Sequence, residues 1–480
     1  MFYLRKGRPN VVFIVLDTLR ADCTRQYGGR LSLPNIDRIG RNSTIYDNAV
    51  APGTYTLTSH VSLFTGKRVR KVETLMKDPI ANYYDSTDPL VSKNKYIGSS
   101  EMTLARRMSY LGYKTALFSN NPFVGNTTGL GEGFSHVVNT FMEEKLRTNK
   151  AALNLIGNDA MREGLTRLAY FLTRMMPKDR LDKLYIGLRN RLNKGFGEKY
   201  GFYKLDQGAE ATNRLIGRYL SRNDENDHFI FVNYMEPHEG YPTNLVTDRY
   251  VDQDKWLYVS NIQNDNQDVG VIREAYRKRI EYMDGQLGRL IGTLKSRGIL
   301  DNAVLILASD HGQSFMEHGQ MYHTLFPYEQ ISHVPLMTAK FENGKQVNTR
   351  ERVGNPVSFT ALYDSVMNVG YQKSDVINGE LRKDNYVFCD HTGISEVWDI
   401  GLLRLLKARS KYADEIYRAK LAKNVFASAI YYKDYKLIHY YNKGTKDELY
   451  NIRSDPEESE NVLDRNKGMA YDMLKADSAS

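Results

Sequence analysis

Four short apolar runs mark the first two thirds of the chain, and each run ends in polar or charged residues. The runs are Asn10–Leu16, Thr115–Phe118, His228–Asn233 and Ala303–Ala308. Segments with the apolar spacing of amphipathic helices separate them, over Ser99–Leu111 and Glu274–Arg297. Near-continuous apolar strands alternating with helices are typical of a parallel sheet that helices cover on both faces. The pattern therefore predicts an α/β core.

Two regions depart from this pattern. Residues 141–225 are helix-forming and basic, which predicts a helical insertion or cap over the core. After about residue 350, the alternating segments Phe426–Tyr432 and Lys436–Tyr441 flank a Lys-Asp-Tyr turn, as in an antiparallel hairpin. We therefore expect a main α/β domain over residues 1–350, which includes the insertion, and a smaller C-terminal subdomain over residues 351–480.

Composition excludes several classes of protein. With 480 residues, 41% of them hydrophobic, and only 13 Pro, the chain can bury a sizeable core and is not disordered, collagenous or coiled-coil. The apolar run Val11–Leu16 is far shorter than the about 20 residues of a membrane helix, and no signal-peptide cleavage site follows it. We expect a cytoplasmic protein without a transmembrane segment, or one attached peripherally to a membrane. The two cysteines, Cys23 and Cys389, argue against a disulfide framework and a Cys-based metal site.

The charge is concentrated in the insertion. The chain has 66 Lys+Arg and 57 Asp+Glu, a formal net charge of +9, and residues 141–200 contribute 13 − 7 = +6 of it. This distribution indicates a local basic surface rather than a nucleic-acid-binding fold, so we expect no nucleic-acid partner. The basic surface is suited to an anionic substrate, glycan- or lipid-linked. Leu165–Met176 is interpreted either as an amphipathic membrane surface or as a cap helix packed on the core.

Polar residues that could carry chemistry stand at the ends of the predicted strands. They are Asp17, Asn120, Asn121, Glu236, His238, Asp310 and His311. In α/β sheets, ligands bind beyond the carboxyl ends of the strands, so we expect these side chains to converge. A structural interpretation stays open for Asp17, since Asp before Thr-Leu-Arg also suits a helix N-cap.

A cluster of hydroxyl residues, Thr54–Thr65, precedes or begins another predicted helix. A hydroxyl at a helix N-terminus lies in a positive potential that suits phosphate or sulfate. It becomes a nucleophile only where a base or a metal ion lowers its pKa. The alternative is a Thr/Ser-rich loop in which Thr58 or Ser59 caps the helix.

The fourth strand is followed by a concentration of histidine. Asp310 and His311 are adjacent and precede a glycine, and His318 and His323 follow, so three of the ten histidines lie within residues 311–323. Carboxylate and imidazole together form a credible ligand pair for a divalent metal. A single histidine here would more often be structural, but three are less easily dismissed.

Together, these segments resemble the sulfatase/alkaline phosphatase superfamily. The resemblance lies in Asn10–Asp22, Leu33–Ala49, Ser59–Gly66, Ser309–Leu336 and Glu448–Glu457, which occur in the order of the family's motifs. It extends from about residue 8 to about residue 464, nearly the whole chain. It implies an alkaline-phosphatase-like fold, with a mixed, mostly parallel sheet sandwiched by helices and a smaller C-terminal antiparallel-sheet subdomain.

The resemblance places the family's nucleophile position on Thr56. Sulfatases have Cys or Ser there, in a Cys/Ser-X-Pro-X-Arg motif that matures to formylglycine, whereas this chain has Thr56-Leu-Thr-Ser-His60. It is similar here to the threonine nucleophile of the phosphodiesterase and lipoteichoic-acid-synthase-like branches. This implies a metal-dependent hydrolase or transferase of phosphate esters with a phospho-threonine intermediate. The alternatives are a sulfatase that works without formylglycine, or a non-catalytic member that binds anions or glycans.

The resemblance also implies one divalent ion, bound by Asp17, Thr56, Asp310 and His311. Calcium-binding sulfatases present two adjacent acids where this chain has only Asp17, so manganese or zinc is favoured over calcium or magnesium. The phosphodiesterases bind a second metal with an Asp-x-x-x-His pair and another His. This chain has Glu236 and His238 at a different spacing, with His323 as the third partner, so a second metal is left open and a one-metal site is preferred.

The remaining histidines are expected to act on the substrate. His238 and His323 would bind substrate oxygens or protonate the leaving group. His60, at the place of the sulfatase arginine, and Asn121 would contact the anion. His318 would either contact substrate or make a structural hydrogen bond. The sequence decides neither hydrolase against transferase nor the oligomeric state.

Overall fold

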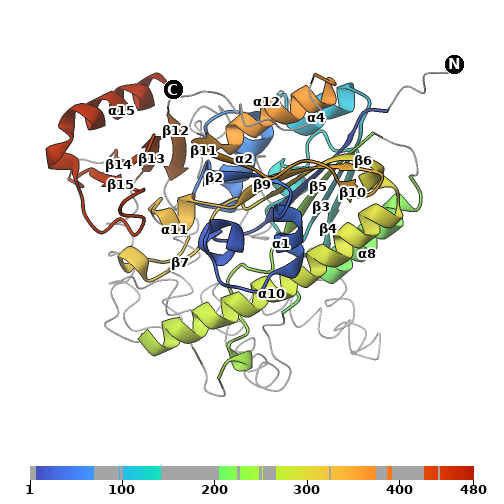
Figure 1. Ribbon diagram of the computed structural model, residues 1–480, viewed down its shortest axis with the longest axis horizontal. Helices are drawn as coiled ribbons and strands as arrows, with labels where there is room; N and C mark the ends of the chain where they lie inside the picture. Colours follow the sequence, from blue (N-terminus) through green and yellow to red (C-terminus); the bar gives the residue numbers. More distant parts are fainter. Residues whose placement is uncertain are drawn as a thin grey trace, which may run out of the picture.

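The computed structural model describes residues 7–69, 97, 101–141, 205–223, 227–247, 251, 266–323, 326–373, 386–391, 426–441 and 444–480. Within these residues the chain forms a large mixed sheet covered by helices and a separate, smaller antiparallel sheet near the C-terminus (Figure 1). The predicted fold class is confirmed.

The described part of the large sheet has the strand order β11-β2-β9-β6-β1-β5-β3-β4, with β10 paired to β9. The strands are β1 (Asn10–Leu16), β2 (Thr44–Val50), β3 (Lys114–Ser119), β4 (His136–Asn139), β5 (His228–Tyr234), β6 (Asn302–Ala308), β9 (Leu336–Glu342), β10 (Lys345–Gln346) and β11 (Glu351–Ser358). Adjacent strands pair in parallel except at β9, which is antiparallel to β6, β2 and β10. The four predicted strands are β1, β3, β5 and β6, with ends that differ by no more than one residue.

Alternate residues of the central strand β1 enter two hydrophobic clusters, one on each face of the sheet. On one face Val12, Ile14 and Leu16 pack in a cluster with α1 (Pro34–Gly40), α8 (Ala209–Leu220) and α10 (Asn266–Ser296). On the other face Val11, Phe13 and Val15 pack with α2 (Thr56–Thr65), α4 (Leu104–Tyr110) and α12 (Phe359–Gly370). Figure 1 shows α8 and α10 below the sheet and α4 and α12 above it. The apolar runs are continuous because both faces of these strands are covered.

The structure differs from the predicted domain limit at residue 350. β11 pairs in parallel with β2, and α12 packs on the large sheet, so residues 351–370 lie with the main domain. The first six of the eight residues of β11 are exposed or half-buried, and Pro356 lies at an irregularity in its register. An exposed edge strand with a proline has no continuous apolar pattern, which is why the limit was placed too early.

The C-terminal sheet has the strand order β12-β13-β14-β15 and contains the predicted hairpin. Its elements are β12 (Val387–His391), β13 (Ala427–Tyr432), β14 (Tyr435–Tyr440) and β15 (Glu448–Asn451), followed by α15 (Lys467–Ala479). Two buried cations connect this sheet to the rest of the protein. Lys436 Nζ lies 2.7 Å from Glu458 and 3.1 Å from Glu329, and Arg68, just after α2, pairs with Asp390 and Asp477.

The edge strand β12 also contacts the loop before α2. Asp390 donates its backbone N–H to the carbonyl of Pro52 at 3.0 Å and bridges to Gly53. The hydroxyl of Thr54 lies 2.8 Å from Nδ1 of His391. This loop is therefore held from both sides, by the large sheet and by the C-terminal sheet.

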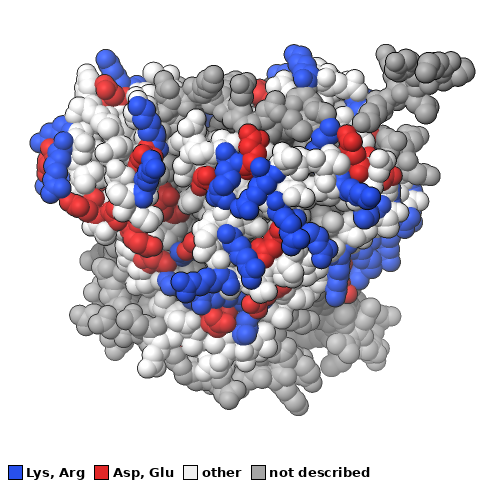
Figure 2. Space-filling model, in the orientation of Figure 1, with Lys and Arg blue, Asp and Glu red and all other residues white. Residues whose placement is uncertain are grey.

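Part of the predicted insertion is described. Residues 205–223 contain α8, which packs on the large sheet through Ala209, Ile216 and Leu220 rather than standing above the core. Residues 142–204, with the basic run and Leu165–Met176, lie outside the described residues. In the part of the chain that the structure describes, no helix has the length and apolarity needed to cross a membrane. On the face in Figure 2, Lys and Arg side chains are interspersed with Asp and Glu.

Candidate active site

Three strand ends and one helix start bring five polar side chains together at the carboxyl edge of the large sheet. Asp17 follows β1, Asn121 follows β3, Asp310 and His311 follow β6, and Thr56 begins α2. The hydroxyl Oγ1 of Thr56 lies 3.3 Å from Asn121 Nδ2 and 3.5 Å from His311 Nε2. Asn121 Nδ2 also donates to Asp17 Oδ2 at 2.6 Å. The predicted nucleophile and the predicted metal ligands are thus adjacent.

Thr56 is the first residue of α2, and neither predicted cap residue caps this helix. The N-cap position is Tyr55, without a side-chain cap hydrogen bond. The hydroxyl of Thr58 donates to the carbonyl of Tyr55, and that of Ser59 donates to the carbonyls of Gly53 and Asp310. The N–H groups of the first turn remain available to an anion beside Thr56, where the helix dipole is positive.

The backbone after Asp17 is strained. Thr18 has φ of 58°, the left-handed region that β-branched residues avoid. Its N–H lies 3.3 Å from Asp310 Oδ1, and its carbonyl accepts a hydrogen bond from the hydroxyl of Tyr276 at 2.9 Å. These two contacts hold the turn in place and set Asp17 beside Asp310.

The carboxylates of Asp17 and Asp310 form a negative centre that needs a cation. Both side chains are fully buried, and Asp17 Oδ1 and Asp310 Oδ2 have no hydrogen-bond partner. Burial, with the neighbouring carboxylate of Asp310, raises the pKa of Asp17 to about 6, and burial raises the pKa of Asp310 to about 7. Each free oxygen faces the other groups of the site, so the carboxylates fit a divalent metal ion.

His311 completes this group. Its Nδ1 lies 3.0 Å from the carbonyl of Gly312, which fixes the proton there and leaves the Nε2 lone pair free. Nε2 lies 3.8 Å from Asp17 Oδ1 and 3.5 Å from Asp310 Oδ2. Asp17, Asp310 and His311 thus form a group able to hold a metal ion. Oxygen and imidazole ligands of this kind suit manganese or zinc.

The buried acid pair predicts an unusual pH dependence for the metal-free protein. Because the folded-state pKa values are raised from 3.8, the folded chain keeps protons that the unfolded chain loses between about pH 4 and pH 7. The two groups therefore stabilise the folded protein at low pH. As pH rises to 7, their contribution to the free energy of unfolding falls by on the order of 1 kcal/mol per pH unit. Urea unfolding of chelator-treated protein across this range, beside Asp310→Asn, measures it. A pH slope that Asp310→Asn leaves unchanged would contradict the prediction.

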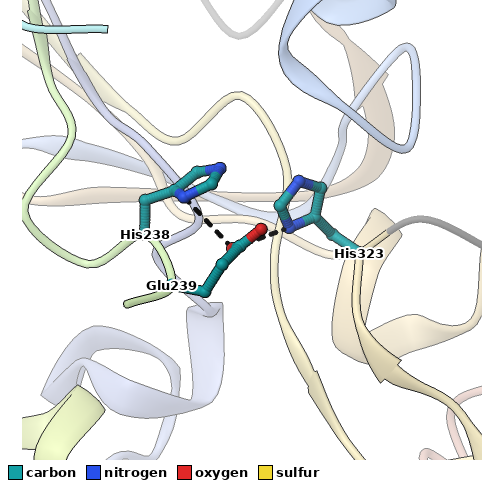
Figure 3. Close-up of side chains that lie close together, drawn as sticks. All are labelled: His238, Glu239 and His323. Carbon is teal, nitrogen blue, oxygen red and sulfur yellow. Dashed lines mark ion pairs between the residues drawn. The ribbon is translucent and has the colours of Figure 1, made fainter. Parts of the chain in front are cut away.

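A second group lies next to the first. His238 and Glu239 follow β5, and His323 follows the short strand β8 (Met321–Tyr322). Figure 3 shows both imidazoles turned toward the carboxylate of Glu239, whose Oε2 lies 3.1 Å from His238 Nδ1 and 3.5 Å from His323 Nδ1. The ring of His323 stacks on that of His311, with centroids 4.3 Å apart, so the two groups adjoin. These three residues also form a group able to hold a metal ion.

Glu239 is the residue of this group that the sequence pattern does not single out. The pattern singles out Glu236 and His238 at the end of the same strand. Glu236 instead accepts hydrogen bonds from the N–H of Ala209 at 2.8 Å and from Asn120 Nδ2 at 3.0 Å, and so positions the start of α8. The available signal was the place of Glu239 directly after His238 in a strand-end loop.

Two histidines that the sequence predicts as substrate contacts, His60 and His318, have these neighbours in the structure. His60 lies one helical turn after Thr56, wholly buried against Phe231, and its Nδ1 bonds to the carbonyl of Thr56 at 2.9 Å. Burial lowers its pKa to about 4, so it is an uncharged interior residue behind Asp310 rather than a contact for an anion. His318 stacks flat on Tyr328, and its Nε2 lies 3.9 Å from Glu458.

Comparison with known proteins gives one family. The sequence model of the Sulfatase family matches residues 9–369. An N-acetylglucosamine-6-O-sulfatase of Bacteroides thetaiotaomicron is 22% identical over 95% of this chain and 83% of its own length, and an arylsulfatase of Clostridium perfringens is 23% identical over 68% of each. The phosphonate monoester hydrolase of Agrobacterium radiobacter has a similar fold, with a TM-score of 0.60 and 17% identity over 98% of this chain and 95% of that one. Since the match covers most of the chain, the protein belongs to the sulfatase family of hydrolases, within the sulfatase/alkaline phosphatase superfamily.

Proposed function

We propose that this protein is a metal-dependent hydrolase of phosphate esters in which the hydroxyl of Thr56 is the nucleophile. The observation that supports the proposal most directly is the position of Thr56 Oγ1, 3.5 Å from His311 Nε2 and at the N-terminus of α2. The free oxygens of Asp17 and Asp310 lie in the same buried site. No other hydroxyl of the described residues combines these neighbours.

The chain's own residues supply most of the mechanism. Asp17, Asp310, His311 and Thr56 would hold a divalent ion, manganese or zinc, which lowers the pKa of a bound hydroxyl and stabilises charge on the phosphoryl oxygens. Thr56 Oγ1 gives its proton to His238 or His323 and attacks phosphorus in line, and the same imidazole returns that proton to the ester oxygen as the bond from phosphorus to this oxygen breaks. The first-turn N–H groups of α2 receive the negative charge that develops on the phosphoryl oxygens.

Phospho-Thr56 is then resolved by an acceptor oxygen. Water attacks phosphorus from the side the leaving group vacated, the Thr56 oxygen departs, and the products are phosphate or a phosphate monoester and the regenerated enzyme. An acceptor alcohol in place of water would give a transferase. Burial and the neighbours His311 and His238 lower the pKa of His323 well below the usual range, so its ring carries no charge before the reaction.

A second candidate is hydrolysis of sulfate esters. The names of the two relatives, an N-acetylglucosamine-6-O-sulfatase and an arylsulfatase, support it. The first of these names makes an ester carried on a sugar the first natural substrate to consider. Threonine, however, cannot mature to formylglycine, so the sulfate would have to be attacked by the Thr56 alkoxide directly or by water. The phosphate ester is therefore preferred.

Turnover of three chromogenic esters tests this choice. A phosphate monoester, a phosphate diester and a sulfate ester are each incubated with the purified protein and manganese or zinc. Phosphate ester turnover at least 100-fold above sulfate ester turnover is expected. The ratio of diester turnover to monoester turnover then distinguishes a phosphodiesterase from a phosphomonoesterase. Turnover of the sulfate ester alone would contradict the proposal and select the second candidate.

A further inference from the structure

The loop before α2 connects β2 of the large sheet to Thr56, but the C-terminal sheet supplies two of its contacts. The backbone N–H of Asp390 donates to the carbonyl of Pro52 at 3.0 Å. The hydroxyl Oγ1 of Thr54, a fully buried residue, lies 2.8 Å from His391 Nδ1. The place of the loop therefore depends on β12 as well as on β2.

The chain that follows α2 is bound to the same strand. Nε of Arg68 donates to Asp390 Oδ2 at 3.1 Å, and its Nη1 lies 3.0 Å from Asp477 Oδ1. The guanidinium also lies over the ring of Phe388, with its Cζ 3.8 Å from the ring centroid. Asp390 thus contacts the chain on both sides of α2, through its N–H before the helix and through its carboxylate after it. Strand β12 therefore fixes the helix that begins with Thr56.

The side chain of His391 is buried with half of its hydrogen-bonding capacity unused. It is 1% exposed, and its Nε2 has no hydrogen-bond partner among the described residues. Burial lowers the pKa of the ring to about 4, so the imidazole is uncharged at neutral pH. Burial of such a nitrogen costs stability, and an apolar ring would fill the space without that cost. The contact between Nδ1 and Thr54 is what distinguishes this histidine from a packing residue.

The start of α2 depends on its loop because no side chain caps the helix. Tyr55 is the N-cap residue and makes no side-chain cap hydrogen bond. The hydroxyl of Thr56 lies 3.5 Å from His311 Nε2, so a small shift of the loop moves it away from the proposed metal ligands. A displacement of a reacting group by about 1 Å can lower the rate by about 10²-fold. A contact two residues before Thr56 can therefore control turnover.

We propose that His391, in the C-terminal sheet, is a positioning residue that acts through Thr54 to set the place of the Thr56 hydroxyl. Its effect on turnover rests on the proposed function, whereas its effect on the order of the loop does not. Asp390 supplies the second contact, but its replacement would leave Arg68 with less compensation for its buried charge and destabilise the fold. The hydrogen bond between His391 and Thr54 is therefore the part of this contact to test.

Steady-state kinetics with the preferred phosphate ester measure the effect on turnover. His391→Phe keeps a ring of similar size and removes Nδ1, and we expect kcat to fall about 10- to 100-fold while KM stays within about threefold. His391→Asn places an amide where Nδ1 lies, and kcat is expected to return to within about threefold of the parent. Rescue by the smaller side chain is the opposite of what a packing role predicts, because asparagine fills the space less well.

Two further variants complete the design. Thr54→Val keeps the shape of Thr54 and removes its hydroxyl, and the double variant with His391→Phe should lose no more than either single variant, since both remove one hydrogen bond. His439→Phe is the matched control. It removes a histidine of the same sheet that pairs with Asp447 at 2.9 Å, and it is expected to keep the parent's kcat.

Hydrogen–deuterium exchange measures the order of the loop without any assay of activity. Amides of residues 51–57 are expected to exchange about tenfold faster in His391→Phe and in Thr54→Val than in the parent, while those of β1 and β6 stay unchanged. Faster exchange in a protein without phosphate ester turnover would uphold the role of His391 in the loop and contradict the proposed function.

Two results would overturn the role of His391. One is exchange of residues 51–57 that neither variant alters. The other is a loss of kcat in His391→Phe that persists in His391→Asn, with lower melting temperatures in both, which would leave His391 as a packing residue.

Discussion

Replacing Thr56 with alanine is expected to lower turnover of the preferred phosphate ester by at least about 10³-fold. The change removes the only hydroxyl that lies beside both His311 and Asn121 in the described residues, so no covalent intermediate can form. The helix keeps its shape, since alanine favours helices and the methyl group fits the space of the threonine side chain. Steady-state kinetics and the mass of denatured protein quenched during turnover measure both the loss and the missing phospho-threonine.

Two variants control for this result. Thr56→Ser retains the hydroxyl and is expected to stay within about tenfold of the parent. Thr58→Ala removes a hydroxyl of the same turn, which only donates to the carbonyl of Tyr55, and is expected to change turnover little. If Thr56→Ala kept the parent's turnover, Thr56 would be no more than a binding residue, and water would have to be the nucleophile.

Chelation is expected to lower turnover by at least about 10³-fold. It should also lower the melting temperature near pH 8, where Asp17 and Asp310 are both ionised. Without a cation, the carboxylates of Asp17 and Asp310 face each other in the interior, which destabilises the folded state. Addition of manganese or zinc should restore both properties. Kinetics and differential scanning calorimetry of treated and restored protein measure the two effects.

Asp17→Asn connects these effects to one side chain. The variant keeps the shape of Asp17 but offers one neutral oxygen, so we expect it to lose turnover and to show a smaller change of melting temperature on chelation than the parent. An outer-surface change, Asp464→Asn, is the matched control, since Asp464 is an exposed residue near α15 that pairs with Lys467. Full turnover in protein shown by elemental analysis to hold no divalent metal would exclude the mechanism.

The strands that the sequence predicts correctly are those buried on both faces. β1, β5 and β6 form the centre of the large sheet, and their side chains are mostly apolar because helices cover each side. β2 and β11 are interrupted by polar or exposed residues, and β9 carries Thr338 and Lys340, so the same criterion does not find them. Their positions depend on pairing with strands distant in the sequence, which no local pattern records.

The site was predictable as far as strand ends determine it. Four of the residues follow parallel strands, so the sheet topology brings them close together: Asp17, Asn121, Asp310 and His311. The roles of His60 and Glu239 depend instead on the direction in which a side chain turns from its backbone. His60 turns into the core one helical turn after Thr56, and Glu239 turns back toward His238 and His323. The spacing of residues along the chain does not predict the direction in which these side chains point.

The contact between β12 and the loop before α2 sets the order in which a working site can arise. Pro52, Gly53 and Thr54 find partners in Asp390 and His391, which leave the ribosome long after Thr56 does. A nascent chain can thus assemble the central strands and the carboxylates of the first group while the nucleophile loop still lacks one of its two supports. The loop before Thr56 gains this support only when the last sheet docks, so an incompletely synthesised chain would carry the proposed metal ligands without a fully supported proposed nucleophile.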